Sequence, residues 1–242
     1  MKKNPLPFIF PLCESEILHK RAKILASLLA IDPAFSAIPA RGIHDCTLKQ
    51  MLESYDALFL QGYLTRTYHE IALTLSGRLI SSAGKFVYTR SYSDKPKYAE
   101  IRMSKDFLLR LKHGPFELNG LSASTSQEAF LLVFEHELCH ALEVALYGQT
   151  GHSNRFLMLA NGLFGHTGTR HSLPTRKAEA AQSGLVIGMQ VSFAYQGKML
   201  TGIITYIGKT ATIMVPSSGG EYRNQSGRRF SKYRVPLNMI RL

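Results

Sequence analysis

Residues 126–147 are the segment that most constrains the fold, because they form a helix with too few polar residues for a protein surface. The run from Ala129 to Phe134 is almost entirely apolar, and a helix that is apolar on all sides is expected to be buried on all sides. Thr125 and Glu128 have the spacing of a capping box at its start, and Gly148 supplies a stop at its end. The sequence therefore predicts one long helix that is buried nearly all round.

The centre of this helix carries the pattern His-Glu-x-x-His, at His136, Glu137 and His140. Each residue turns an α-helix by about 100°, so the two histidines lie about 40° apart and about 6 Å along the axis. Both imidazoles can then bind one tetrahedral zinc ion, while Glu137 points elsewhere and can accept a proton from a zinc-bound water. Burying these side chains without a partner is costly, and a metal ion supplies the partner. The spacing predicts a zinc centre for amide hydrolysis, with Glu137 as general base.

A third ligand is expected from the segment after the helix. His152 follows His140 by twelve residues, and Gly148 and Gly151 permit the chain to turn back toward the metal. Ser153 can then cap a further helix, whose apolar side chains would pack inward: Phe156, Leu159, Ala160 and Leu163. We prefer His152 as the third ligand, and three residues remain as alternatives: Glu143, His166 and His171.

The segments before the central helix alternate between helix and strand patterns. We expect helices over residues 14–31 and 48–60, and a short helix over 104–114 that its final glycine closes. One or two strands are expected within 69–88, and another over 98–104. The stretch "SGRLISSAGKF" within the first of these is expected to be either a plain structural strand or a sheet edge on which an extended peptide lies, with Gly84 allowing close approach.

From about residue 185 the chain consists of short strands separated by glycine turns, which predicts a small β-barrel. Its strand rhythm is similar to that of Tudor- or KOW-type modules. Residues 183–242 contain eight Lys or Arg and one acid, a net +7 of the chain's +12. Six aromatic residues alternate with these basic residues, and we expect at least half of them in the core: Phe193, Tyr195, Tyr206, Tyr222, Phe230 and Tyr233.

A basic surface with aromatic platforms suits single-stranded or flexible nucleic acid, so DNA or another nucleic acid is the expected partner of the barrel. Two alternatives remain open. The basic surface either serves solubility alone, or the barrel is a protein-interaction or autoinhibitory element.

Composition excludes several classes of protein. Hydrophobic residues make up 45% and charged residues 19% of the chain, which is typical of a soluble folded protein. No apolar run reaches about 18 residues, so no membrane span is expected, and the N-terminal segment lacks the pattern of a signal peptide.

Cys13, Cys46 and Cys139 are too few for a disulfide framework or a four-cysteine zinc ribbon. The cytoplasm is therefore the expected compartment, and Cys139 is expected to be a packed core residue rather than a ligand or redox switch.

Residues 47–171 together resemble the SprT-like metalloprotease family. The resemblance rests on "HELCHALEVALYGQTGHSNRF", in which His-Glu-x-x-His is followed after about a dozen residues by Gly-His-Ser-x-x-Phe. The upstream segments "YDALFLQGYL", "LSGRLISSAGKF" and "EIRMSKDFLL" fit the family as well. The resemblance implies that His136, His140 and His152 hold Zn²⁺ and that Glu137 is the general base. It also implies an α+β fold with helices on a small antiparallel sheet.

The eukaryotic Spartan members of that family degrade proteins crosslinked to DNA, so the resemblance implies a protein substrate associated with nucleic acid and a role in DNA repair. Two departures from the family pattern bear on this. Ser153 stands where a glycine often follows the third histidine. Many relatives also carry a C-terminal zinc ribbon with four cysteines, whereas this chain has the basic barrel in that position.

The oxyanion of a tetrahedral intermediate needs a hydrogen-bond donor, and four residues downstream are candidates: Tyr147, His166, Arg170 and His171. Surface or packing roles are the alternative for each. His171 is preferred as this catalytic residue, because "TRH" falls where the chain can return to the cleft.

These observations predict four segments: an N-terminal helical extension (1–40), a SprT-like metalloprotease domain (41–172), a linker or frayed helix (173–184) and a basic SH3-like barrel (185–242). The predicted function is that of a zinc-dependent endopeptidase. The alternative is a nucleic-acid-binding protein in which the zinc site is structural.

Overall fold

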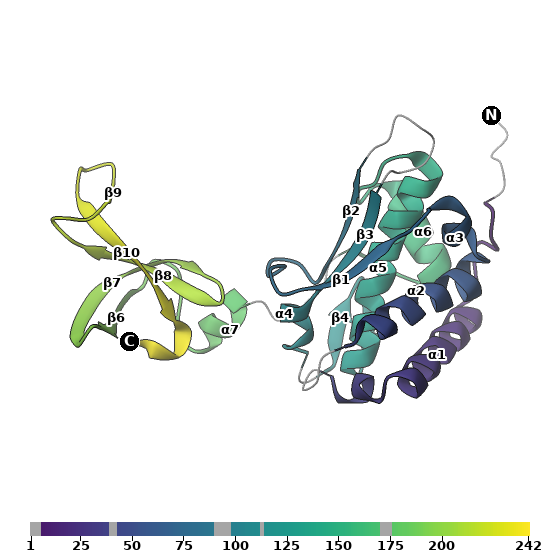
Figure 1. Ribbon diagram of the computed structural model, residues 1–242, viewed down its shortest axis with the longest axis horizontal. Helices are drawn as coiled ribbons and strands as arrows, with labels where there is room; N and C mark the ends of the chain where they lie inside the picture. Colours follow the sequence, from purple (N-terminus) through teal and green to yellow (C-terminus); the bar gives the residue numbers. More distant parts are fainter. Residues whose placement is uncertain (1–5, 39–42, 90–97, 112–113, 170–175) are drawn as a thin grey trace. The chain divides into compact units, whose positions relative to one another are not determined.

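The computed structural model describes residues 6–38, 43–89, 98–111, 114–169 and 176–242. The chain divides into two compact units, Met1–Leu173 and Pro174–Leu242, which Figure 1 shows coloured along the sequence. The first unit contains six helices among its described residues: α1 (Glu14–Ile31), α2 (Asp45–Leu60), α3 (Tyr63–Thr67), α4 (Lys105–Leu108), α5 (Ser126–Tyr147) and α6 (Asn154–Phe164). A 3-10 helix, η1 (Pro33–Ala37), follows α1.

The main sheet of the first unit has three strands in the order β1 (Ala72–Ser76), β3 (Tyr98–Ser104), β2 (Gly84–Thr89). Strand β2 runs antiparallel to β3, whereas β1 runs parallel to it. The α+β prediction is confirmed, but the expected antiparallel sheet is in fact mixed. The reason is that residues 77–83 cross the end of β3, where Ser104 bonds the carbonyls of Leu79 and Ala83, and so place β1 and β2 on opposite edges.

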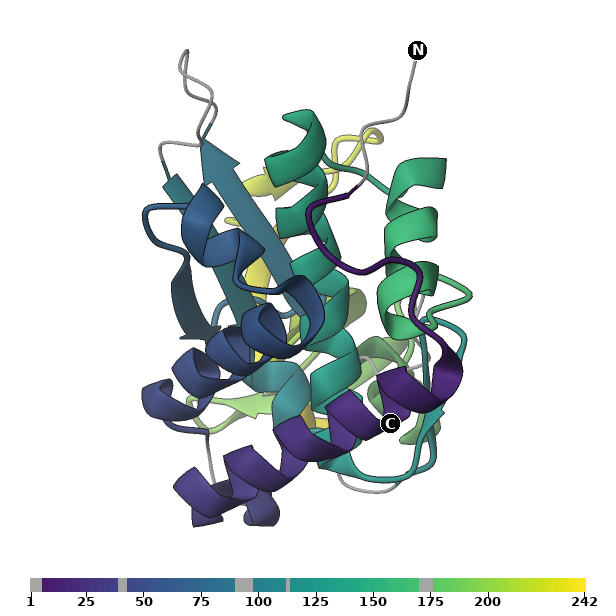
Figure 2. The ribbon, with the colours of Figure 1, turned by 90° about the vertical axis from the view of Figure 1, so that its right-hand side faces the viewer.

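Helix α5 is the central element of this unit, as its apolar composition predicts. Figure 2 shows it between the sheet and α6, and its buried residues lie on all sides of the helix. Thr125 and Glu128 form the predicted capping box, and Gly148 ends the helix in the left-handed conformation. Helix α1 spans the predicted residues, and α4 ends at Leu108, earlier than expected.

The second unit is an antiparallel sheet with its own apolar core. Its six strands lie in the order β11 (Ile240–Arg241), β6 (Gln190–Tyr195), β7 (Lys198–Ile207), β8 (Thr210–Pro216), β10 (Arg229–Pro236), β9 (Tyr222–Arg223). A 3-10 turn, η2 (Leu237–Met239), separates β10 from β11. This agrees with a small all-β module, while the Tudor or KOW type stays a prediction.

The segment expected as a linker contains helix α7 (Arg176–Gln182). Ala180 on this helix is buried in the core of the second unit, and its carbonyl accepts a hydrogen bond from the backbone N–H of Leu185. Helix α7 is therefore part of the second unit rather than a free connection. In the described residues, no helix combines the length and apolarity that a membrane crossing requires.

Candidate metal centre and active site

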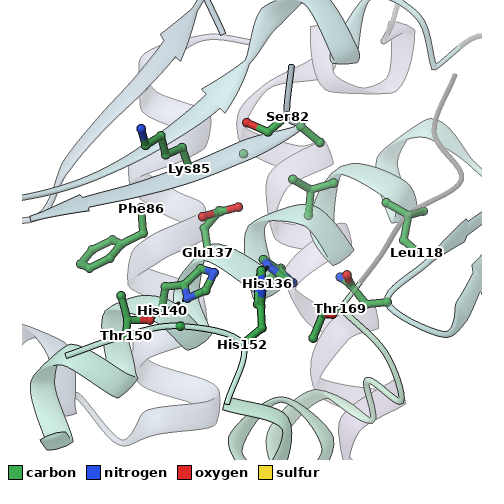
Figure 3. Close-up of a pocket in the computed structure, with 15 residues that line it drawn as sticks. Ser82, Lys85, Phe86, Leu118, His136, Glu137, His140, Thr150, His152 and Thr169 are labelled. Carbon is green, nitrogen blue, oxygen red and sulfur yellow. Dashed lines mark hydrogen bonds between the residues drawn. The ribbon is translucent and has the colours of Figure 1, made fainter. Parts of the chain in front are cut away.

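Three histidines converge at the middle of α5. His136 and His140 project from the helix, and His152 approaches from the loop between α5 and α6 (Figure 3). The three ring centroids are each 5.0 Å from the other two, and one ligand atom from each ring lies within 4.8 Å of the others. The Nε2 atoms of His136 and His152 are 3.0 Å apart. The loop thus brings the preferred third histidine to the pair on the helix.

This donor set fits zinc. Imidazole nitrogens about 2.1 Å from one tetrahedral zinc ion lie about 3.4 Å from each other. The Nε2 atoms of His136 and His152 are 3.0 Å apart, and all three ligand atoms lie within 4.8 Å of one another. Burial and the neighbouring His152 lower the pKa of His140 to about 4. The ring is therefore neutral near pH 7, which is the form that binds a metal ion.

One aromatic side chain supports all three imidazoles. The ring of Phe156, on α6, lies 4.9 Å from His136, 4.6 Å from His140 and 5.0 Å from His152, measured between centroids. Phe156 is fully buried and packs against the rings of all three histidines. The expected inward packing of this residue is confirmed, and its contact with the histidines shows what that packing does.

Glu137 lies beside the histidines against the edge of the main sheet. A Cβ atom added to Gly84 of β2 would lie 2.6 Å from Cγ and Oε1 of Glu137, so the carboxylate needs a glycine there. Burial raises the pKa of Glu137 to about 8, and a hydrogen bond from the backbone N–H of Phe86 partly offsets this. A nearby divalent cation favours the ionised form of such a carboxyl group.

A cavity of about 350 Å³ opens beside the histidines and Glu137. Strand β2 and the residues before it form one wall, and α5 forms the floor (Figure 3). The remaining lining residues come from other loops: Leu118, Asn119, Thr150, Gly151 and Thr169. The cavity is large enough for side chains of a peptide to lie next to the three imidazoles.

Strand β2 turns its open edge away from β3. In an antiparallel pair, residues alternate between bonding the partner strand and pointing away from it. Ser104 donates its backbone N–H to Ala83, so Lys85 and Val87 also pair with β3. The backbone groups of Gly84, Phe86 and Tyr88 are consequently at the edge, on the side where the cavity lies.

The sequence matches the model of the SprT-like family over residues 48–176. The chain belongs to the SprT-like family. No curated protein and no solved structure gives a significant match. Membership of the family indicates a domain of the metalloprotease type, and the three clustered histidines are a suitable place for its metal.

The other candidate residues of the SprT-like domain have structural roles. Glu143 is not among the clustered ligand atoms, because its carboxylate binds the loop after α5. Ser153 is the N-cap residue of α6, as predicted, but its hydroxyl donates to Glu143 and makes no capping bond to the helix. Cys139 is fully buried in the apolar core, as expected.

The structure bears on two of the four residues considered as donors to the oxyanion, His166 and Tyr147. His166 is buried and its Nε2 lies 2.8 Å from Oε2 of Glu135, so neither ligation nor oxyanion binding is open to it. Tyr147 does not line the cavity, and its ring lies under the guanidinium of Arg155 at 4.8 Å. Arg170 and His171 fall outside the described residues, and the proposed role of His171 stays a prediction.

Sequence reasoning missed part of the cavity wall although a signal was present. Asn119 and Gly120 form the turn of a hairpin between β4 (Phe116–Leu118) and β5 (Leu121–Ala123), both with positive φ. Asn-Gly between apolar residues is a strong hairpin signal. The carbonyl of Asn119 accepts hydrogen bonds from the N–H groups of residues 167 and 168, which places Thr169 at the cavity.

A buried charged cluster holds α5 in place behind the metal centre. Glu135, next to His136, accepts hydrogen bonds from Arg21 on α1 and from the hydroxyl of Tyr55 on α2. His166 completes the cluster. Burial alone would raise the pKa of Glu135, but the charge and hydrogen bonds of Arg21 and the hydrogen bond of His166 keep it below its usual range. The N-terminal helix is thereby tied to the helix that carries the metal ligands.

Proposed function

We propose that this protein is a zinc-dependent endopeptidase. The observation that carries the proposal is the convergence of three imidazoles on one point beside a buried carboxylate and an open strand edge. A bound zinc ion supplies Lewis acidity, which polarises the scissile carbonyl and makes a water molecule more acidic. His136, His140 and His152 would hold that ion, and Phe156 keeps their rings in place.

The remaining steps fall to this chain's own groups. An extended peptide can pair with the edge of β2 through the backbone groups of Gly84 and the carbonyl of Phe86, since the N–H of Phe86 bonds Glu137. This pairing supplies main-chain hydrogen bonds without regard to side chain. Glu137 then accepts the proton of the attacking water and returns it to the leaving amine. Its position against Gly84 brings the carboxylate next to the strand on which the peptide would lie.

A purely structural zinc site is less well supported. Such a site is closed by four protein ligands, and two further residues on α5 have side chains that can bind zinc, Cys139 and Glu143. Cys139 is buried in the core, and Glu143 is occupied by the loop. Among the described residues, the cluster comprises the three histidines and adjoins a cavity.

The test is metal content and proteolysis of the wild type and of Glu137→Gln. We expect both proteins to bind stoichiometric zinc, and Glu137→Gln to hydrolyse an unfolded protein substrate about 10²- to 10⁴-fold more slowly, since it lacks the base. Glu53→Gln, on the exposed face of α2, is the matched control and should be fully active. A wild type without zinc, or a Glu137→Gln variant with full activity, would refute the proposal.

We further propose that the second unit binds nucleic acid and recruits the peptidase to nucleic-acid-associated proteins in the cytoplasm. Residues 174–242 hold ten Lys or Arg against two acids, a net +8 of the chain's +12. Lys232 and Arg234 are two residues apart on β10, so their side chains lie on the same face of the strand. This is the outer face, because the buried Val235 points to the opposite side. The register aligns Tyr206 of β7 with Arg234 through β8.

The exposed aromatic residues on this face support single-stranded nucleic acid as the ligand. Tyr206 and Tyr222 are 52% and 42% exposed, and the ammonium of Lys232 lies 5.5 Å from the centroid of the Tyr222 ring. Exposed rings next to cations allow bases to stack while phosphates are neutralised. The test is binding of the full chain to a single-stranded oligonucleotide at several salt concentrations.

A further inference from the structure

Glu143 is a buried carboxylate whose two oxygens are both taken by the loop that follows α5. Its Oε2 accepts hydrogen bonds from the hydroxyl of Thr150 at 2.9 Å and from the backbone N–H of Gly151 at 2.8 Å. Its Oε1 accepts one from the hydroxyl of Ser153 at 2.9 Å. Glu143 is 3% exposed, so these bonds are shielded from water. The residues that it binds flank His152 on both sides.

Thr150 extends this arrangement to a second histidine. Its Oγ1 lies 2.7 Å from Nδ1 of His140. A threonine hydroxyl has one proton, and this proton is donated to Glu143. Thr150 must therefore accept from His140, which assigns the proton of the neutral ring to Nδ1. Nε2 of His140 then carries the lone pair that a metal ion requires.

We propose that Glu143 and Thr150 are positioning residues for the metal centre. The chain from Glu143 through Thr150 to His140 fixes the tautomer and ring orientation of one ligand. The bonds from Glu143 to Gly151 and Ser153 fix the loop that carries another. One carboxylate thus organises two of the three histidines, although it touches no metal itself. This inference rests on the metal-binding part of the proposed function and does not depend on peptide hydrolysis.

The expected change in zinc affinity can be taken from metal sites in general. Partners that orient a ligating histidine through its second ring nitrogen change metal affinity by about 10- to 100-fold. A role limited to bracing the loop would act differently, because it would lower the stability of the metal-free protein and would not distinguish the tautomers of His140.

The experiment compares Thr150→Val, Thr150→Ser and Ser153→Ala in the full-length chain. Zinc affinity is measured by competition with a chromophoric chelator, and the protonation of the His140 ring by ¹⁵N NMR of the metal-free protein. Thr150→Val keeps the shape of the side chain and the Gly151 bond to Glu143 but removes the link to His140. Ser153→Ala removes one loop bond and leaves that link intact.

We expect Thr150→Val to weaken zinc binding by about 10- to 100-fold and to lose the uniform Nδ1–H form of His140. Thr150→Ser restores both, and Ser153→Ala retains the tautomer with a smaller loss of affinity. Wild-type affinity in Thr150→Val overturns the proposal. Equal losses in Thr150→Val and Ser153→Ala, with equal drops in the melting temperature of the metal-free protein, also overturn it, because they indicate only a brace for the loop.

The outcomes separate this proposal from the proposed peptidase. A wild type that binds zinc and cleaves nothing leaves the positioning role in place and removes the peptidase. A wild type that binds no zinc removes both.

Discussion

The two units of this protein differ in where their charged side chains lie: buried and hydrogen-bonded in the first unit, exposed on the surface in the second. In the first unit, the carboxylates of Glu135 and Glu143 are buried and hydrogen-bonded, each by at least three donors. In the second unit, Lys232 and Arg234 are exposed on an outer sheet face. Buried charges are tolerated only with partners, so they fix geometry. Exposed charges cost little and leave the unit able to meet an external anion.

The first prediction tests this contrast with one arginine from each unit. Arg21→Ala removes the cation that binds both oxygens of Glu135 and leaves a fully buried carboxylate without its counter-ion. Breaking such a pair costs about 3–5 kcal/mol, which we expect as a loss in the free energy of unfolding of the first unit. Urea denaturation followed by far-ultraviolet circular dichroism measures it.

Arg234→Ala is the matched control in the second unit. Because Arg234 is exposed, its removal should change stability by less than about 0.5 kcal/mol. If Arg21→Ala and Arg234→Ala lower the free energy of unfolding equally, the buried Arg21–Glu135 pair contributes no more to stability than an exposed arginine does.

The second prediction concerns Gly84, where the sheet edge meets Glu137. An alanine Cβ at this position overlaps the end of the Glu137 side chain, which must move, while the backbone of β2 accepts alanine without strain. Misplacing a catalytic group by about 1 Å can cost about 100-fold in rate. We therefore expect Gly84→Ala to lower kcat by about that factor, with zinc content and melting temperature close to those of the wild type.

Gly77 provides the control for this substitution. It lies just after β1, and an added Cβ there meets nothing within 4 Å. Gly77→Ala should retain full activity. Full activity in Gly84→Ala would mean that the carboxylate does not act from its position against β2.

The sequence predicted the elements whose signals are local. Helix α5 follows from its apolar composition, capping box and final glycine, and α1 from its amphipathic pattern. His136, Glu137 and His140 are fixed relative to one another by helix geometry alone. The hairpin at Asn119 and Gly120 has an equally local signal, because Asn-Gly between apolar residues favours such a turn.

What the sequence could not predict depends on contacts between distant segments. His166 and Glu143 were candidate ligands by residue type, and only the folded chain shows that each is already bound, to Glu135 and to the loop respectively. The parallel pairing of β1 with β3 depends on how the chain crosses the sheet. In the second unit, alternation could not say which aromatics face outward: Phe193 is buried, whereas Tyr206 and Tyr222 are exposed.

The third and smallest predicted effect concerns the exposed cations of the second unit. If Lys232 and Arg234 each contact one phosphate of a single strand, substitution of either by alanine should reduce the slope of log K against log[salt] by about 0.7. Affinity should fall modestly for all sequences alike, because phosphate contacts carry no sequence information. Fluorescence anisotropy with a labelled oligonucleotide measures both quantities.

Lys20→Ala, on α1 of the first unit, is the control and should leave the slope unchanged. A slope that is insensitive to Lys232 and Arg234 but falls with Lys20 would assign the anion-binding surface to the other unit, and the contrast between buried and exposed charge would then not separate their functions.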